Sequence, residues 1–337
     1  MNAYGAQSHA GMPVRPGMTV PLPGHLHAQQ DKLRELADLG YTDIWSAEAD
    51  GADAFTPLAL AAAWEPRLRL GTAIVPAYTR SPACFAQSVA TLADAAPGRF
   101  AIGIGSSSNV IVEKWNGIPF EEPYKKVRDV VRFLNDALSG EKITKKYDTF
   151  EVNGFKMAIR PEVKPQILVA ALREGMLRLA AREADGTIIN WLSANDVSRV
   201  ADVVRDASGG VPKEIVCRIF VCPSTNTDQV RAAAKFAIAA YLNVPVYAAF
   251  HEWLGRGDDL RAMWVAWKSG DRKAALAAIP DHVVDDLIVH GSPEQCRDRI
   301  RQYFDNGVTT SSLAILALDP ELDHWQAVRD LSPSAHK

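Results

Sequence analysis

Short apolar runs alternate with amphipathic runs along almost the whole chain, and this rhythm limits the possible folds more than any other feature. Eight runs have the length and β-branched content of strands, and each is followed by a run with apolar residues at helical spacing. The predicted strands are 18–22, 42–46, 68–75, 99–104, 166–170, 187–191, 214–222 and 308–316. Alternating strands and helices require a parallel sheet covered by helices, and eight such strands close a barrel. We therefore predict an α/β protein with a (βα)8 TIM barrel.

An open, doubly wound sheet is the alternative to a barrel for the same rhythm. Its sharpest mark would be GxGxxG directly after the first strand, where glycines let the backbone approach a pyrophosphate. The sequence Gly103-Ile104-Gly105 instead follows the fourth predicted strand, and Ser108 stands where the third glycine would be. The barrel is therefore the better interpretation.

The length of 337 residues exceeds the roughly 200–250 that a barrel often needs. Residues 1–16 are small and polar, and we predict a flexible tail there, followed by a single domain over 17–337. Three stretches interrupt the rhythm as insertions: about 106–122 after strand four, 141–164 before strand five, and 243–286 after helix seven. The second contains Asn153-Gly154, which predicts a hairpin turn.

Composition excludes several classes of protein. A net charge of −3 gives no basic footprint for nucleic acid. The longest apolar stretch, 237–250, is too short to cross a bilayer, and no signal peptide is apparent, which predicts a cytoplasmic protein without a membrane partner. The four cysteines form no CxxC pair, so we expect reduced, mostly buried thiols. His25-x-His27 lacks a third ligand nearby, and no metal site is predicted.

Barrel active sites lie at the carboxyl ends of the strands, which selects the segments that follow each strand. Two of these segments suit an anion. Residues 106–109 (Ser-Ser-Ser-Asn) offer consecutive backbone donors, and 173–176 begin a helix with free N–H groups. The alternative is that these residues only form turns and helix caps.

Acidic side chains follow the second strand. Glu48 and Asp50 are the acids best placed for proton transfer, because burial in a pocket can fit a carboxyl group for general acid catalysis. The alternative is that both are solvated loop charges.

Several ordered motifs together resemble the luciferase-like superfamily of flavin-dependent barrels. They are LGTAIVP at 70–76, YTRSP at 78–82, PGRFAIGIG at 97–105, and shorter pieces at 39–45, 55–58, 117–120 and 177–186. The resemblance covers about 17–318. Within the superfamily the chain looks most like actinobacterial oxidoreductases that use coenzyme F420, a deazaflavin, and have no settled substrate.

This resemblance implies a barrel that is usually dimeric or a higher homo-oligomer. It also implies a bulge in strand three with a non-proline cis peptide bond, which by position joins Ala73 and Ile74 behind the cofactor ring. It places contacts to the cofactor tail after strands four and five. Those contacts would be Gly105, Ser106, Ser107, Ser108, Asn109, Ala171, Leu172, Arg173, Gly175 and Met176.

The sequence departs from that pattern at two places. Relatives often carry several glycines after strand five, where this chain has Gly175 alone, which puts the closeness of approach in doubt. The sugar-phosphate dehydrogenases of the family have Asp-His after strand two, where this chain has Ala47-Glu48, which argues against that activity. Glu48 either replaces the histidine as proton donor or only lines the pocket.

We therefore predict an F420-dependent oxidoreductase that transfers hydride to or from an unknown small organic substrate. Tyr78, Arg80, Asn190 and Trp191 are the predicted pocket residues. An FMN-dependent luciferase-like monooxygenase is the closest alternative, and a non-catalytic deazaflavin carrier is an alternative of another class. The 243–286 insertion either roofs the pocket or builds a subunit contact.

Overall fold

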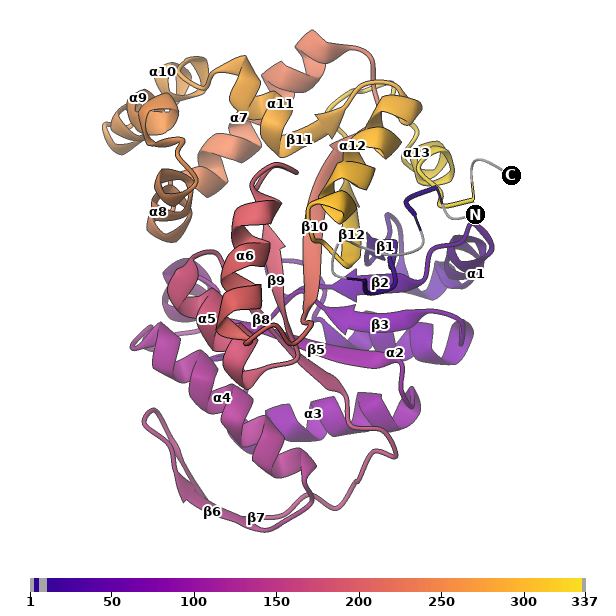
Figure 1. Ribbon diagram of the computed structural model, residues 1–337, viewed down its shortest axis with the longest axis vertical. Helices are drawn as coiled ribbons and strands as arrows, with labels where there is room; N and C mark the ends of the chain where they lie inside the picture. Colours follow the sequence, from indigo (N-terminus) through magenta and orange to yellow (C-terminus); the bar gives the residue numbers. More distant parts are fainter. Residues whose placement is uncertain (1–2, 6–10, 335–337) are drawn as a thin grey trace.

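The computed structural model describes residues 3–5 and 11–334 and contains a closed parallel barrel (Figure 1). Its strands pair in the order β1-β2-β3-β5-β8-β9-β10-β12, and β12 pairs with β1 to close the ring. The predicted α/β class and TIM barrel are therefore confirmed. The short β4 continues the edge of β3 along β5, and β11 continues the edge of β9 along β10.

The eight predicted strands match the barrel strands within a few residues. The strands are β1 (Gly17–Thr19), β2 (Asp43–Ser46), β3 (Arg69–Thr72), β4 (Val75–Pro76), β5 (Phe100–Gly105), β6 (Ile143–Lys146), β7 (Glu151–Phe155), β8 (Gln166–Ala170), β9 (Gly186–Asn190), β10 (Glu214–Cys222), β11 (Ile288–His290) and β12 (Thr310–Ile315). The α-helices are α1 (Gln30–Asp38), α2 (Phe55–Trp64), α3 (Pro82–Ala95), α4 (Pro123–Leu138), α5 (Glu174–Glu183), α6 (Val197–Ala207), α7 (Thr227–Leu242), α8 (Pro245–Trp253), α9 (Gly257–Lys268), α10 (Arg272–Ala277), α11 (Asp281–Leu287), α12 (Pro293–Asp305) and α13 (His324–Asp330).

The barrel interior is filled by side chains from the strands alone. Trp45, Ala101, Leu168, Ile188 and Val216 form this inner cluster, to which no helix contributes. Gly71 makes room for the indole of Trp45, because a Cβ at this position would lie 2.2 Å from its ring. The middle of the barrel is therefore a packed core rather than a channel.

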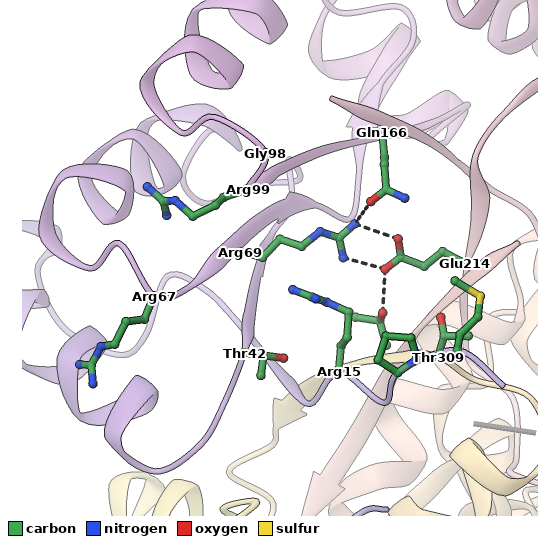
Figure 2. A pocket seen from close by; sticks show the side chains of 12 residues that line it. Arg15, Thr42, Arg67, Arg69, Gly98, Arg99, Gln166, Glu214 and Thr309 are labelled. Carbon is green, nitrogen blue, oxygen red and sulfur yellow. Dashed lines mark hydrogen bonds and ion pairs between the residues drawn. The ribbon is translucent and has the colours of Figure 1, made fainter. Parts of the chain in front are cut away.

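A buried ionic cluster closes the amino end of the barrel. Arg69 lies at its centre and donates to Glu214 at 2.7 and 2.8 Å and to Gln166 at 2.5 Å (Figure 2). It also donates to Asp43 at 3.0 Å. Each of these residues is the first of its strand. Burial opposes ionisation of Glu214, but the Arg69 guanidinium outweighs it and holds the pKa of that carboxyl below its usual range.

The insertion at 141–164 forms the expected hairpin of β6 and β7, which lies at the edge of the molecule (Figure 1). Its turn is not at Asn153-Gly154, however, because both residues lie inside β7. The chain reverses at 147–150, where the Tyr147 amide donates to the Phe150 carbonyl. Gly154 has φ +74° beside a register shift, so its conformational freedom serves a bulge rather than the turn. The 106–122 insertion, expected to be a loop, contains a π-helical turn at Val110–Trp115.

The insertion at 243–286 is helical, and it contacts the barrel at the carboxyl end of β9. Tyr247 of α8 shares a hydrogen bond with the Asn190 side chain at 3.3 Å. Arg256 pairs with Asp196 and Asp286, each at 2.8 Å. The insertion therefore covers one side of the barrel mouth, as one of its two predicted roles requires.

The N-terminal segment differs from the flexible tail predicted for 1–16, as far as its described residues show. Tyr4 is 1% exposed, and its hydroxyl donates to the Leu331 carbonyl. The Ala3 amide donates to the Pro333 carbonyl, so the two ends of the chain lie side by side (Figure 1). Arg15 forms a β-bridge with Thr310. Apolar Tyr4 and Val14 thus belong to the core, and residues 6–10 lie outside the described part.

The described cysteines carry free thiols, and Cys217, Cys222 and Cys296 are buried while Cys84 is exposed. Over residues 3–5 and 11–334, no single helix is long and apolar enough to cross a membrane. The pair α7 and α8 passes that test together by length and composition alone, with a bend of 104° between them.

The burial of His251 in α8 predicts that the free energy of unfolding depends on pH. Its side chain is fully buried, and burial, aided by Arg256, lowers its pKa to about 3. The unfolded chain takes up this proton near pH 6.5, so the stability from neutral His251 is present above pH 6.5 and is lost as pH falls toward 3. In urea titrations at a series of pH values, we expect the unfolding free energy of His251→Leu to fall less steeply than that of wild type between pH 6.5 and pH 3. The exposed His282→Leu should follow wild type, and an equal slope in His251→Leu would contradict the assignment.

Candidate functional site

One half of the barrel mouth is an apolar wall built by β3, β4, β5 and β8. The Ala73–Ile74 peptide bond is cis, as the family resemblance implies. Both residues pack on the inner cluster together with Ala170 and stay partly exposed. Gly105 lies between Ile74 and Ala170, because a Cβ at position 105 would lie 3.0 Å from Ile74 and 3.1 Å from Ala170. A side chain at position 105 would therefore crowd this part of the wall.

Two donor segments flank this wall. In 106–109, which follows β5, the amides of Ser107 and Ser108 have no acceptor among the described residues. Ser107 has φ +62°, a conformation rare for a non-glycine residue and often found at functional sites. Helix α5 begins at Glu174, and Gly175 faces open space with nothing within 4 Å of a Cβ. Both predicted anion segments thus present backbone N–H groups that no described residue accepts from, which is the chemistry that an anion requires.

The predicted contacts after β8 differ among themselves. The Ala171 amide donates to the Ile188 carbonyl at 3.0 Å, so this residue belongs to the sheet ladder and is 3% exposed. Arg173 is exposed at the N-cap of α5, and Leu172 and Met176 are half-buried beside it. The free donors therefore begin at the helix rather than at the end of the strand.

Glu48 and Arg80 form an ion pair at the rim of the mouth. The two guanidinium nitrogens lie 2.6 and 2.5 Å from the two carboxylate oxygens, and both side chains are largely buried. The Glu48 amide donates to the Ile74 carbonyl at 3.0 Å, which ties this loop to the apolar wall. Asp50, the other predicted acid, is exposed and has no hydrogen bond or ion pair among the described residues.

Tyr78 and Trp191, two predicted pocket residues, are packed into their surroundings. The Tyr78 hydroxyl donates to the Glu121 carbonyl at 2.6 Å and so anchors the 106–122 insertion. Burial, with Glu121 and Glu122 nearby, raises the pKa of Tyr78 to about 12. Trp191 has φ +54°, is 2% exposed and packs against Phe220 with ring centroids 4.2 Å apart. These two residues shape the mouth from behind rather than line it.

The other half of the mouth is polar, and sequence reasoning found only Asn190 of it. Thr19, Arg218 and Ser312 come from β1, β10 and β12, and the Thr19 and Ser312 hydroxyls lie 3.0 Å apart. Arg218 pairs in register with both Asn190 and Ser312. The sequence signal for Arg218 is a single cation within the apolar run 214–222. It lies two residues after Val216, so the two side chains face the same side of the strand.

A cavity of about 470 Å³ lies at the opposite, amino end of the barrel, among Arg15, Arg69, Arg99 and Glu214 (Figure 2). Its central cation already has carboxylate partners, and this end of a TIM barrel serves stability rather than catalysis. The carboxyl-end mouth is therefore the candidate site. Within the described residues, no cluster of three or more His, Cys, Asp or Glu side chains could hold a metal.

A closed (βα)8 barrel whose carboxyl-end mouth joins an apolar wall, free backbone donors and an ion pair has the architecture of a TIM-barrel enzyme. The model of the luciferase-like monooxygenase family matches residues 7–310. The chain therefore belongs to that family, which confirms the resemblance read from 70–105.

Curated relatives extend over most of the chain. A 5,10-methylenetetrahydromethanopterin reductase of Methanolobus tindarius is 27% identical over 278 residues, which cover 80% of this chain and 84% of that protein. A putative coenzyme F420-dependent oxidoreductase of Mycobacterium tuberculosis is 25% identical, with coverage of 81% and 86%. The coenzyme F420-dependent tetrahydromethanopterin reductase of Methanopyrus kandleri superposes with a TM-score of 0.78 at 19% identity, covering 95% of this chain and 97% of that one. At that identity the likeness shows the shared barrel fold.

Proposed function

We propose that this protein is a coenzyme F420-dependent oxidoreductase that transfers hydride to or from a small organic substrate. The observation that carries the proposal is the apolar wall of Ala73, Ile74, Gly105 and Ala170 beside free amide donors at both of its edges. The names of the relatives from Mycobacterium tuberculosis and Methanopyrus kandleri support the same cofactor.

The deazaflavin supplies a ring carbon that carries two electrons as hydride when it is bound. The chain's own part is to hold and shield it. Ile74 and Ala170 would back the ring, while the amides at 106–109 and at the start of α5 would hold the anionic tail. With the ring fixed against this wall, a substrate carbon can approach only from the open face of the mouth, which supplies the proximity that hydride transfer needs.

A proton must also move when an alcohol carbon becomes a carbonyl, and we propose Glu48 for this step. Both of its oxygens accept hydrogen bonds from Arg80, which suits an ionised carboxylate that takes up a substrate proton. In oxidation the C–H pair leaves as hydride and the O–H proton passes to Glu48; reduction runs the same path in reverse. Arg80 positions the carboxylate.

Filling the apolar wall tests the placement of the cofactor. In Gly105→Val, the added methyl groups would crowd Ile74 and Ala170, so we expect the dissociation constant for F420 to rise at least about tenfold in fluorescence titrations. Gly257→Ala in α9 is the matched control, because a Cβ there meets Glu252 only at 3.6 Å. An unchanged F420 affinity in a folded Gly105→Val protein would place the ring elsewhere.

The second candidate function is an FMN-dependent monooxygenase, which the description of the matching family favours. Parallel titrations with F420 and FMN separate the two, since tight FMN binding without F420 binding would replace the first proposal. Tight F420 binding with no turnover of any alcohol, aldehyde or imine in a panel would favour a carrier protein. We also expect a homodimer, which size-exclusion chromatography with light scattering checks.

A further inference from the structure

Arg218 points into the barrel from the centre of β10. Val216, two residues earlier, belongs to the inner cluster, and side chains alternate along a strand. Arg218 therefore faces the same interior, one layer nearer the carboxyl ends. Its register partners on the neighbouring strands are Asn190 and Ser312, which bring an amide and a hydroxyl to the same level.

The Arg218 guanidinium is partly buried and has no counter-charge among the described residues. No carboxylate of the described residues lies within ion-pair distance of Arg218, and its Nε is buried with no hydrogen-bond partner. Two other largely buried arginines, Arg69 and Arg256, each pair with two carboxylates. A buried charge without a partner is costly, so such a group is typically kept for a ligand.

Strand order places Arg218 across the mouth from the apolar wall. In a ring of eight strands, the fourth neighbour of β10 in either direction is β3, which leads into Ala73 and Ile74. A planar group resting on Ile74 would turn its open face toward Arg218. The space between the two walls is where a substrate must lie for hydride transfer.

The surroundings of Arg218 favour a singly charged ligand with an apolar body. Its guanidinium lies 5.2 Å from the Phe220 ring, and Tyr241 of α7 and Tyr247 of α8 are the ionisable groups that act on it. The donors beside it are neutral, so one positive charge is available. A phosphate dianion calls for more positive charge than this, whereas one carboxylate matches one guanidinium in a bidentate pair.

We propose that Arg218 binds the carboxylate of the substrate, so that the enzyme acts on small organic monocarboxylic acids. This inference rests on the proposed function, because the carboxylate is expected to hold the reacting carbon over the cofactor ring. Arg218 would form two parallel hydrogen bonds to the carboxylate, with Asn190 contributing a third donor.

Calorimetry on the full chain with F420 bound tests the proposal, using benzoate, phenylacetate and 2-hydroxybutyrate as probes and benzamide as the neutral analogue of benzoate. We expect at least one carboxylate to bind, Arg218→Met to weaken it at least about thirtyfold, and Arg218→Lys to retain part of the affinity. Benzamide should bind weakly, and with equal affinity, to wild type, Arg218→Met and Arg218→Lys. Arg205→Met, at an exposed pair on α6, is the matched control and should equal wild type.

Three results would overturn the assignment: no carboxylate binds wild type, carboxylates bind Arg218→Met as well as wild type, or Arg218→Met loses F420 instead. Loss of F420 binding in Arg218→Met would mean that Arg218 binds an anionic group of the cofactor rather than of the substrate. A melting temperature of Arg218→Lys equal to wild type keeps the comparison valid where Arg218→Met is unstable. F420 binding by wild type is titrated separately, and an absence of F420 binding would remove the proposed function. Carboxylate binding by Arg218 would then still be measured by calorimetry without the cofactor.

Discussion

Replacing Arg69 by Met is expected to lower the free energy of unfolding by about 3–5 kcal/mol, enough to unfold a marginally stable barrel. The variant would leave Glu214 without its two hydrogen bonds from the guanidinium, at 4% side-chain exposure. Asp43, whose side chain is 0% exposed, would keep its ion pair with Arg15 and its hydrogen bond from the Thr42 hydroxyl. Uncompensated buried charge rather than lost attraction is the main source of the cost. Urea denaturation followed by circular dichroism measures it.

Two companion variants sharpen this test. In Arg69→Met/Glu214→Leu both members of the main ion pair become apolar. We expect most of the lost stability to return, because β10 no longer carries an unpaired buried carboxylate. Arg34→Met, at an exposed pair with Asp31, should cost less than about 0.5 kcal/mol. A loss below about 1 kcal/mol in Arg69→Met would show that the amino end of the barrel is not held by this cluster.

Replacing Glu48 by Gln is expected to reduce kcat/KM about 10²–10⁴-fold for a substrate whose oxidation releases a proton. The amide keeps the shape of the carboxylate but cannot take up the proton that leaves with the hydride. The substrate would come from a panel of hydroxy acids and secondary alcohols, with turnover followed by the fluorescence loss of oxidised F420. The F420 affinity of Glu48→Gln should remain within about threefold of wild type, because Glu48 lies at the rim rather than in the apolar wall.

Asp50→Asn is the matched control for this prediction. Asp50 lies on the same loop, is exposed and has no hydrogen bond or ion pair among the described residues, so its activity should stay close to wild type. Turnover by Glu48→Gln equal to wild type would remove Glu48 from the mechanism and leave the ion pair with Arg80 a structural role. Because F420 binding is measured separately, that result would leave the proposed cofactor in place.

Local features were predictable from the sequence wherever neighbours in the chain decide the structure. The capping box of Ser292 and Gln295 with Pro293 at the first turn marks the start of α12, and the structure contains all three features. Asn153-Gly154 has an equally strong local signature, yet it forms a bulge inside β7. The pairing of β7 with β6 sets that register, and the pairing is not a local property.

The sequence by itself determined the barrel and its family, because the periodicity of apolar residues and the order of elements leave few ways to bury the core. Only the tertiary structure decided which polar groups meet. Arg69, Glu214 and Asp43 form one cluster, Glu48 finds Arg80, and Arg218 is left with no counter-charge in the described part of the chain. Electrostatic partners are chosen by distance in space, and closing the ring brings together strands that lie more than a hundred residues apart in sequence.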